Sequence, residues 1–178
     1  MRTLVIGASG KIGKYFLKKR DKNLFFTYHK NKIKHGIKFN LLIDDINEIL
    51  IRYKINKVIL LSAYSDPDFC KRNKIISNKL NVIKTKKMLR EIIKRKIYFI
   101  FFSTEYVYGG YRGFYNEKSL TKPINIYGKQ KLKIEKFINK YAQNFSIFRI
   151  AKTFGDDPKD KGLVSSFIKL AKIKNQKL

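Results

Sequence analysis

The chain has 178 residues, of which 44% are hydrophobic, so it is long and apolar enough for one domain with a buried core. Its longest apolar runs, such as residues 97–102, have the length of a strand and are too short to span a membrane. The single cysteine, Cys70, excludes an internal disulfide, and an apolar strand follows the first residues with no signal peptide before it. We therefore expect a cytoplasmic location. His29, His35 and one cysteine are too few to predict a metal site.

The formal net charge of +28 raises the question of a polyanionic partner. The lysines are spread along the whole chain, and Lys, Ile and Asn are all abundant while Trp is absent. This pattern favours compositional bias over a nucleic-acid site, and no nucleic-acid-binding motif accompanies it. Nucleic acid is therefore disfavoured as a partner, although the positive field favours anionic ligands of any kind.

Strands and helices alternate along the chain. Short apolar runs predict strands at residues 4–6, 24–28, 36–41, 57–61, 97–102 and 145–150. Helical spacing of apolar residues predicts helices at residues 11–20, from Asp44 or Asp45 to about 53, and at 74–95, 125–141 and 163–172. The long helix 74–95 carries its apolar stripe at Ile76, Leu80, Ile83, Leu89 and Ile93.

This alternation is typical of parallel strands joined by crossover helices. Runs such as 58–61 have no polar alternation, which suits a sheet that is covered on both faces. The sequence therefore predicts an α/β fold with a doubly wound parallel sheet and helices on both faces. No repeat and no linker divides the chain, so we expect residues 1–178 to form one domain.

A glycine-rich turn connects the first strand to the first helix. Gly7, Gly10 and Gly13 follow the spacing GxxGxxG, and Ser9, Lys11 and Ile12 lie between them. Glycines let the backbone turn tightly and approach a pyrophosphate, and the start of a helix offers free N–H groups. This context predicts a Rossmann-type NAD(P)-binding domain.

The end of the second strand bears on the choice of dinucleotide. NAD sites usually place a carboxylate there to bind the ribose hydroxyls. This chain has Thr27, Tyr28, His29 and Lys30 at that place, with two basic side chains and no carboxylate. We therefore expect NADP(H) to be preferred over NAD(H).

Tyr127 and Lys131 form a YxxxK pair at the start of the predicted helix 125–141. Residues four apart share a helix face, and an ammonium group beside a phenol lowers the pKa of the phenol towards working pH. The tyrosine can then protonate a carbonyl oxygen while a hydride arrives at its carbon. The motif alone means little, because three other tyrosines also have a lysine four positions later. The context favours Tyr127, since Ser103 and Thr104 end the preceding strand, where ligands bind in such sheets.

Several stretches in order along the chain resemble the extended short-chain dehydrogenase/reductases, and most closely the dTDP-4-dehydrorhamnose reductase branch. The most specific stretch is 103–110, with the sequence STEYVYGG. The others are 5–13, 61–68, 80–82, 115–117, 123–131, 148–150 and 154–155.

The resemblance implies roles for individual residues. Thr104, Tyr127 and Lys131 would be the catalytic triad, with Thr104 orienting the carbonyl. Glu105 stands where the branch usually has an Asp that assists protonation. The resemblance also places cofactor contacts at Ser62, Ala63, Tyr64 and Ser103, and at Asn40, where many relatives have Asp.

In this resemblance the substrate would be a nucleotide-linked 4-keto sugar, and the pathway would be polysaccharide biosynthesis. Relatives continue beyond the last predicted helix into a substrate-binding region, so we expect that region to be missing here. Two alternatives remain open: a non-catalytic regulatory subunit that binds a dinucleotide, and a sugar-nucleotide epimerase or dehydratase. A homodimer through the helices after the fourth and fifth strands is a further expectation.

Overall fold

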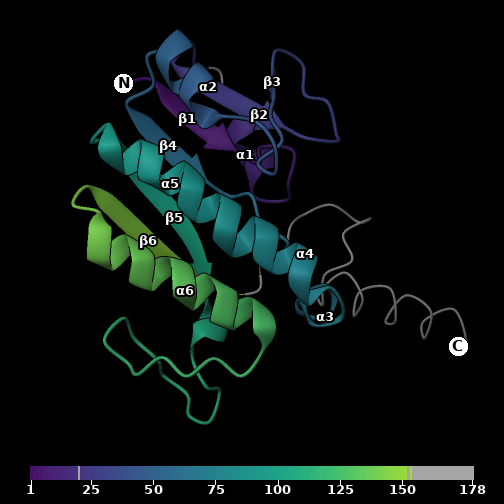
Figure 1. Ribbon diagram of the computed structural model, residues 1–178, viewed down its shortest axis with the longest axis vertical. Helices are drawn as coiled ribbons and strands as arrows, with labels where there is room; N and C mark the ends of the chain where they lie inside the picture. Colours follow the sequence, from purple (N-terminus) through teal and green to yellow (C-terminus); the bar gives the residue numbers. More distant parts are fainter. Residues whose placement is uncertain (20, 152, 154–178) are drawn as a thin grey trace, which may run out of the picture.

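A six-stranded parallel sheet forms the centre of the domain in the computed structural model, which describes residues 1–19, 21–151 and 153 (Figure 1). The strand order is β3-β2-β1-β4-β5-β6, with all neighbouring pairs parallel. The chain therefore reverses its direction of winding between β1 and β4, and such a switch point is where open α/β sheets bind ligands. The strands are β1 (Thr3–Ile6), β2 (Leu24–Tyr28), β3 (Ile37–Lys38), β4 (Lys57–Leu60), β5 (Tyr98–Thr104) and β6 (Phe145–Ile150).

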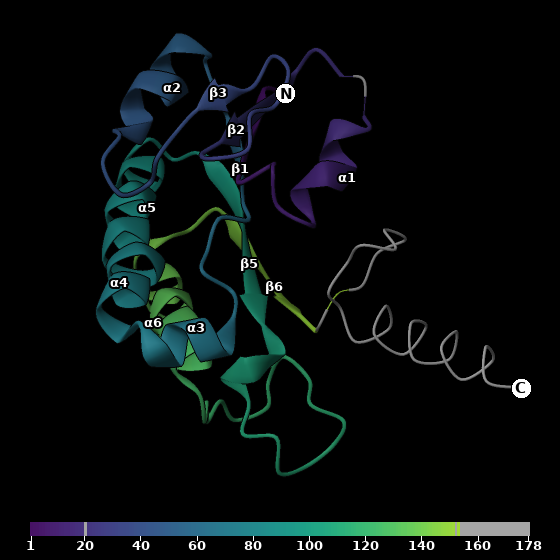
Figure 2. The ribbon, with the colours of Figure 1, turned by 90° about the vertical axis from the view of Figure 1, so that its right-hand side faces the viewer.

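Helices cover both faces of the sheet, as predicted. Figure 2 shows α1 (Gly13–Leu17) on one side, and α2 (Ile46–Arg52), α5 (Thr85–Lys94) and α6 (Ile126–Tyr141) on the other. Two of these helices begin at side-chain caps: Asp45 accepts a hydrogen bond from Asn47 N, and Asn125 accepts one from Gly128 N. The Rossmann-type doubly wound fold is thus confirmed.

The larger core lies under α2, α5 and α6, and Phe99, Phe101 and Leu89 are among its fully buried side chains. A smaller cluster around Val5 and Ile59 lies on the α1 side of the sheet. β1 is buried at all four positions, which agrees with the apolar run without polar alternation. Among the described helices, none is both long and apolar enough to cross a membrane.

One predicted helix is shorter in the structure, one helix of the structure was not predicted, and one predicted helix cannot be compared. The first helix is shorter than the predicted span 11–20, because its first and last turns contain 3₁₀-type bonds, from Tyr15 N to Ile12 O and from Lys19 N to Phe16 O. A helix that was not predicted, α3 (Pro67–Arg72), begins at an Asp66 cap with proline in its first turn. The predicted helix 163–172 and the stretch 154–155 lie outside the described residues.

The long helix 74–95 is present, but its middle is a π-helix, η1 (Lys79–Lys84), between α4 (Lys74–Asn78) and α5. A π turn adds a residue, which rotates the residues that follow by about 100° against a continuous α-helix. The predicted apolar stripe was therefore wrong in part. Ile76 and Ile83 are at least half exposed, whereas Ser77, Asn81 and Thr85 are buried.

Candidate active site

A cavity of about 750 Å³ opens at the carboxyl ends of β1, β4, β5 and β6. This volume is in the range of cavities that hold cofactors and drug-sized ligands. The predicted residues that line it come from the glycine turn, from the turn after β4 and from the proposed catalytic group. They are Gly7, Gly10, Lys11, Ile12, Gly13, Ala63, Ser103, Thr104, Glu105, Tyr127 and Lys131.

A second cavity of about 190 Å³ lies at the ends of β2 and β3, where Ser9, His29, Asn40 and Ser62 contribute to its wall. The two cavities share Gly7, Gly10, Leu61 and Ala63, so they adjoin across the glycine turn. The result is an elongated site along the edge of the sheet. Of the predicted cofactor residues, Lys30 and Tyr64 line neither cavity.

The three glycines of the turn have different tasks. Gly7 has a φ of +87°, and a Cβ there would lie 2.9 Å from Ser62 N; at Gly13 a Cβ would lie 2.5 Å from Ala8. These two positions need glycine for the fold itself. At Gly10 the only close atom among the described residues is Gly7 O at 3.3 Å, although Gly10 lines both cavities. The missing side chain at Gly10 therefore leaves room for a ligand, as a pyrophosphate site requires.

Tyr127 and Lys131 lie one turn apart on α6 and are both buried. Lys131 Nζ donates a 2.7 Å hydrogen bond to Phe102 O at the end of β5, and it lies 5.9 Å from the centroid of the Tyr127 ring. Burial lowers the pKa of Lys131 to about 8, so its ammonium is mostly protonated at neutral pH.

The expected lowering of the Tyr127 pKa is not found. Burial raises this pKa, and the nearby Cys70, Glu105 and Tyr106 act in the same direction. Desolvation of the phenolate is the largest cause of this rise. Tyr127 is therefore a neutral phenol at physiological pH, which is the protonation state that an acid needs before it donates its proton.

Thr104 and Glu105 lie at the end of β5 and in the 3₁₀ turn η2 (Glu105–Val107). Thr104 Oγ1 donates to Glu105 Oε2 at 3.0 Å and accepts from Tyr106 N at 3.3 Å. The Glu105 carboxylate thus contacts Thr104 in this structure and is connected to the candidate catalytic group through it.

A buried amide network holds the turn after β4 against α6. Asn81 accepts from Tyr64 N and donates to Tyr64 O, both at 2.9 Å, and it donates to Gln130 Oε1 at 2.8 Å. Gln130 in turn donates to Ser77 Oγ. The sequence stretch with Asn81 was noted only as part of the resemblance. The structure shows that Asn81 fixes the backbone of Tyr64 next to the cavity, although the Tyr64 side chain does not line it.

Residues that the sequence reasoning missed also line the cavity. Asp66 and Asp68 come from the start of α3, and Tyr106 packs edge-on against Tyr127 with ring centroids 6.4 Å apart. The Asp66-Pro67 pair was a signal for the start of a helix that could have been used. Gly128 was quoted only within its motif, yet a Cβ there would lie 2.1 Å from Tyr106 O.

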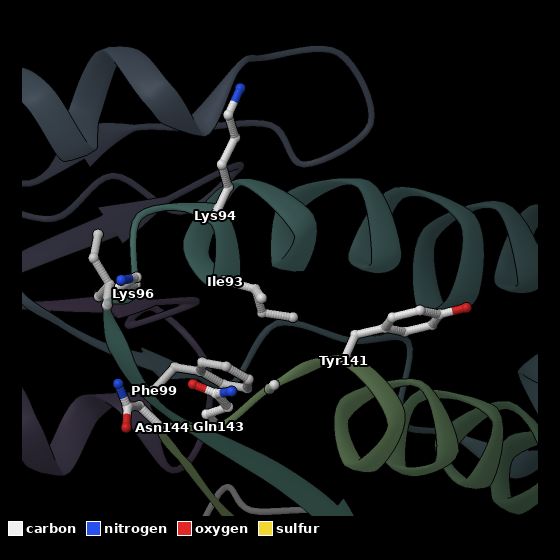
Figure 3. A pocket seen from close by; sticks show the side chains of 9 residues that line it. Ile93, Lys94, Lys96, Phe99, Tyr141, Gln143 and Asn144 are labelled. Atoms are coloured by element: carbon white, nitrogen blue, oxygen red, sulfur yellow. The ribbon is translucent and has the colours of Figure 1, made fainter.

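A further cavity of about 150 Å³ lies at the opposite edge of the sheet, between the ends of α5 and α6 and the start of β5. Figure 3 shows the Lys94 side chain pointing away from Phe99, and the Tyr141 ring to the right of Phe99, at the end of α6. None of the predicted site residues lines this cavity. In the part of the chain that the structure describes, no three His, Cys, Asp or Glu side chains gather closely enough to hold a metal ion.

The family described as "RmlD substrate binding domain" matches residues 1–178, the whole chain. The chain belongs to this family. Methionine adenosyltransferase 2 subunit beta from Xenopus tropicalis is 26% identical to this RmlD-family chain, over 87% of the chain and 48% of the relative. A protein named "Probable low-salt glycan biosynthesis reductase Agl14" from Haloferax volcanii is 27% identical, over 87% of this chain and 54% of the relative. The chain thus spans about half the length of these relatives.

Solved structures show the same likeness. A hypothetical dTDP-4-dehydrorhamnose reductase from Sulfolobus tokodaii is 30% identical with a TM-score of 0.77, over 88% of this chain and 58% of its own. The dTDP-4-dehydrorhamnose reductase of Bacillus anthracis in complex with NADP is 20% identical with a TM-score of 0.79, over 96% and 59%. MoeE5 in complex with UDP-glucose and NAD is 22% identical with a TM-score of 0.81, over 95% and 60%, and these last two show the fold alone. The predicted resemblance to dTDP-4-dehydrorhamnose reductases is confirmed.

Proposed function

We propose that this chain is the dinucleotide-binding and catalytic part of a reductase that acts on a nucleotide-linked 4-keto sugar. The observation that carries the proposal is that Thr104, Tyr127 and Lys131 share one cavity with the glycine turn. The family match and the likeness to dTDP-4-dehydrorhamnose reductases support it. The substrate class comes from these relatives.

The described residues fit a dinucleotide. Two adjoining cavities follow the edge of the sheet, and Gly10 between them has no side chain to obstruct a pyrophosphate. Gly7, Ser9, Lys11, Ile12 and Gly13 would surround the phosphates. Asn40 and His29 would lie near the adenosine end, and Ser62, Ala63 and Ser103 would lie along the channel.

We propose NADP(H) as the preferred cofactor. The smaller cavity has no carboxylate among the described residues that line it, and His29 is in its wall. A carboxylate there would bind the ribose hydroxyls of NAD, whereas a basic group suits the 2′-phosphate of NADP. Lys30 does not line the cavity, so we expect it to act through its charge or after a change of rotamer.

In the proposed reaction, the bound reduced nicotinamide supplies the hydride. Tyr127 Oη donates its proton to the carbonyl oxygen of the sugar, and Thr104 Oγ1 donates a hydrogen bond to the same oxygen. The Lys131 ammonium then stabilises the phenolate that remains on Tyr127. Thr104 must release Glu105 to take this role, since its hydroxyl now donates to that carboxylate.

The first test is titration of the chain with NADPH and NADH, followed by fluorescence. We expect saturable binding with the tighter affinity for NADPH, and loss of binding in Gly10→Asp, which would place a carboxylate in the phosphate site. Failure of both cofactors to bind would refute the cofactor assignment.

The second test is oxidation of NADPH with dTDP-4-dehydrorhamnose as the substrate. We expect turnover to fall by about 10²-fold or more in Tyr127→Phe. Tyr53→Phe is the matched control, since Tyr53 also has a lysine four positions later but packs against Phe25 away from the cavity. A chain that binds NADPH and never oxidises it would refute the catalytic proposal.

That second outcome would favour a regulatory subunit, which the similarity to methionine adenosyltransferase 2 subunit beta supports as an alternative function. The alternative expects dinucleotide binding without turnover, together with a stable complex with a partner enzyme. Size-exclusion chromatography of the chain with a methionine adenosyltransferase catalytic subunit would test it directly.

We also propose that the chain forms a homodimer through the face of α4 and α6. An open groove of about 610 Å³ lies there, and its wall includes Ile75, Ile126 and Leu132 together with several lysines. Because a two-fold axis would bring the lysines of both copies together, the dimer should strengthen with salt. Light scattering at low and high salt tests this, and a monomer in both would refute it.

A further inference from the structure

A buried carboxylate shares the face of α6 that carries the candidate catalytic lysine. Glu135 follows Lys131 by one turn on α6, so both residues lie on the same face of the helix. Only 1% of Glu135 is exposed, although an unpaired carboxylate is costly to bury. The functional residues described above do not explain why a charge is retained at this position.

Two partners hold the Glu135 carboxylate in place. Ser103 Oγ donates to Glu135 Oε1, and Arg149 on β6 donates through Nε to both oxygens at 3.2 Å and through Nη2 to Oε2 at 2.8 Å. A guanidinium that bonds both oxygens of a carboxylate is a specific and strong arrangement. The carboxylate is therefore held between β5, β6 and the helix that carries Lys131.

Arg149 extends this arrangement to the loop after η2. Its Nη1 donates to Tyr108 Oη at 2.8 Å and to Glu117 O at 3.1 Å, and Tyr108 Oη donates to Asn116 O at 2.7 Å. Tyr108 also stacks on Tyr115, with ring centroids 4.6 Å apart. The position of Glu135 is thus connected to the loop that begins at the catalytic end of β5.

We propose that Glu135 is a positioning residue of the candidate active site: it is the buried counter-charge that keeps the Lys131 ammonium protonated, and Ser103 and Arg149 orient it for this task. The proposal rests on the proposed function for its meaning in catalysis. Glu135 does not line the cavity, and its charge acts on the site through Lys131, which does.

The electrostatics of the site agree with this role. Burial lowers the pKa of Lys131 to about 8, and Glu135 is the strongest influence that opposes this fall. Without Glu135, desolvation would act almost alone and Lys131 would lose its charge near neutral pH. The side chain of Arg149 is 20% exposed against 2% for Glu135, so solvent screens the arginine more than the carboxylate.

Other ionisable groups also face Lys131. Cys70 on α3 raises the pKa of Lys131 more weakly than Glu135 does. Tyr127 is on the same helix, and Glu105, Asp66 and Asp68 lie in the same cavity wall. None of these four is among the groups that shift the pKa of Lys131. Burial raises the pKa of the Cys70 thiol and that of the Tyr127 phenol, so both are neutral near pH 7 and neither can replace the charge of Glu135.

The test is a direct titration of Lys131 by NMR in protein labelled with ¹³C at the lysine ε-carbons, with the resonance assigned by its loss in Lys131→Met. In the wild type we expect a midpoint at about pH 8. In Glu135→Gln we expect the midpoint to fall by about one pH unit or more. Glu117→Gln is the matched control, because Arg149 contacts only the backbone of Glu117. This variant should titrate like the wild type.

Glu135→Gln leaves Arg149 without its carboxylate, so this variant can fail to fold. The double variant Glu135→Gln/Arg149→Met removes both charges of the pair, which avoids an unpaired buried ion. We expect the double variant to show the same fall in the Lys131 midpoint. Glu135→Asp keeps the charge and should restore the midpoint towards the wild-type value. An unchanged midpoint in folded Glu135→Gln, or in the double variant, would overturn the proposal.

The titration needs neither cofactor nor substrate, so its result is separate from the proposed function. If the chain also reduces the sugar, the alkaline limb of its kcat profile should move to lower pH in Glu135→Gln with little change in KM. A shifted titration without turnover would leave the role of Glu135 towards Lys131 intact and refute the reductase. Turnover without a shifted titration would support the reductase and refute the role of Glu135 towards Lys131.

Discussion

Replacement of Lys131 by methionine gives a test of the buried charge that does not depend on any assumed activity. Burial lowers the pKa of Lys131 from 10.5 to about 8. At 1.36 kcal/mol per pKa unit, the buried ammonium destabilises the fold by about 3 kcal/mol. Lys131 is 5% exposed, so solvent screening reduces this figure little.

The sign of the pH dependence follows from linkage. Because the folded-state pKa is below the unfolded one, the destabilisation is fully present below pH 8 and disappears as pH rises through 8 towards 10.5. By pH 9.5 about 2 kcal/mol should be recovered. The Lys131→Met variant has no such titration. It loses the hydrogen bond to Phe102 O at every pH, which is a constant difference between the two proteins.

The assay is urea unfolding of the wild type and Lys131→Met at pH 7 and pH 9.5. The free energy of unfolding of the wild type, relative to the variant, should rise by about 2 kcal/mol between the two pH values. The raised pKa of Tyr127 acts above pH 10 in the opposite direction, but it is common to both proteins and cancels. A difference that stays flat from pH 7 to 9.5 would refute the claim that Lys131 is buried with a lowered pKa.

Three further predictions concern close packing and the buried amides, and each is measured by urea unfolding. Gly13→Ala should lower the free energy of unfolding by about 2 kcal/mol or more, because its Cβ would lie 2.5 Å from Ala8, whereas Gly10→Ala should stay within about 1 kcal/mol of the wild type and yet weaken dinucleotide binding. Equal losses of stability in the two variants would contradict the division of tasks between these glycines. Gly128→Ala should destabilise by about 2 kcal/mol, although alanine favours a helix, since its Cβ would lie 2.1 Å from Tyr106 O; a stabilised variant would contradict this contact. Asn81→Ala should cost about 2–4 kcal/mol because it removes three hydrogen bonds to Tyr64 and Gln130. Lys79→Ala, at an exposed position of the same helical segment, is the control that should change stability little.

Much of the fold could be predicted because its signals are local. Apolar runs identified five of the six strands within two residues at each end, and β6 begins and ends at the predicted residues 145 and 150. The short β3 lies inside the predicted span 36–41, and Asp45 capped α2 as expected. The glycine turn could be recognised because a strand, three glycines and a helix follow one another directly.

The residues of the candidate site could be predicted, but their burial, hydrogen-bond partners and pKa values could not. The sequence placed Thr104 at the end of a strand and placed Tyr127 and Lys131 at the start of the next helix. The structure brings all three to one cavity. The pKa of Tyr127 could not be predicted, because it depends on how deeply α6 buries the phenol. Nor could the pairing of Glu135 with Arg149, since its members are separated by 14 positions and belong to a helix and a strand.

By itself, the sequence determined the order of the six strands, the glycine turn and the helix that carries Tyr127 and Lys131. Each of these depends on residues within a few positions of one another, so local patterns contain the information. Only the tertiary structure decided which side of helix 74–95 is buried, since one π turn changed the face that meets the core. It also decided the charges in the site, because desolvation depends on all the chain that packs around a group and not on its neighbours in sequence.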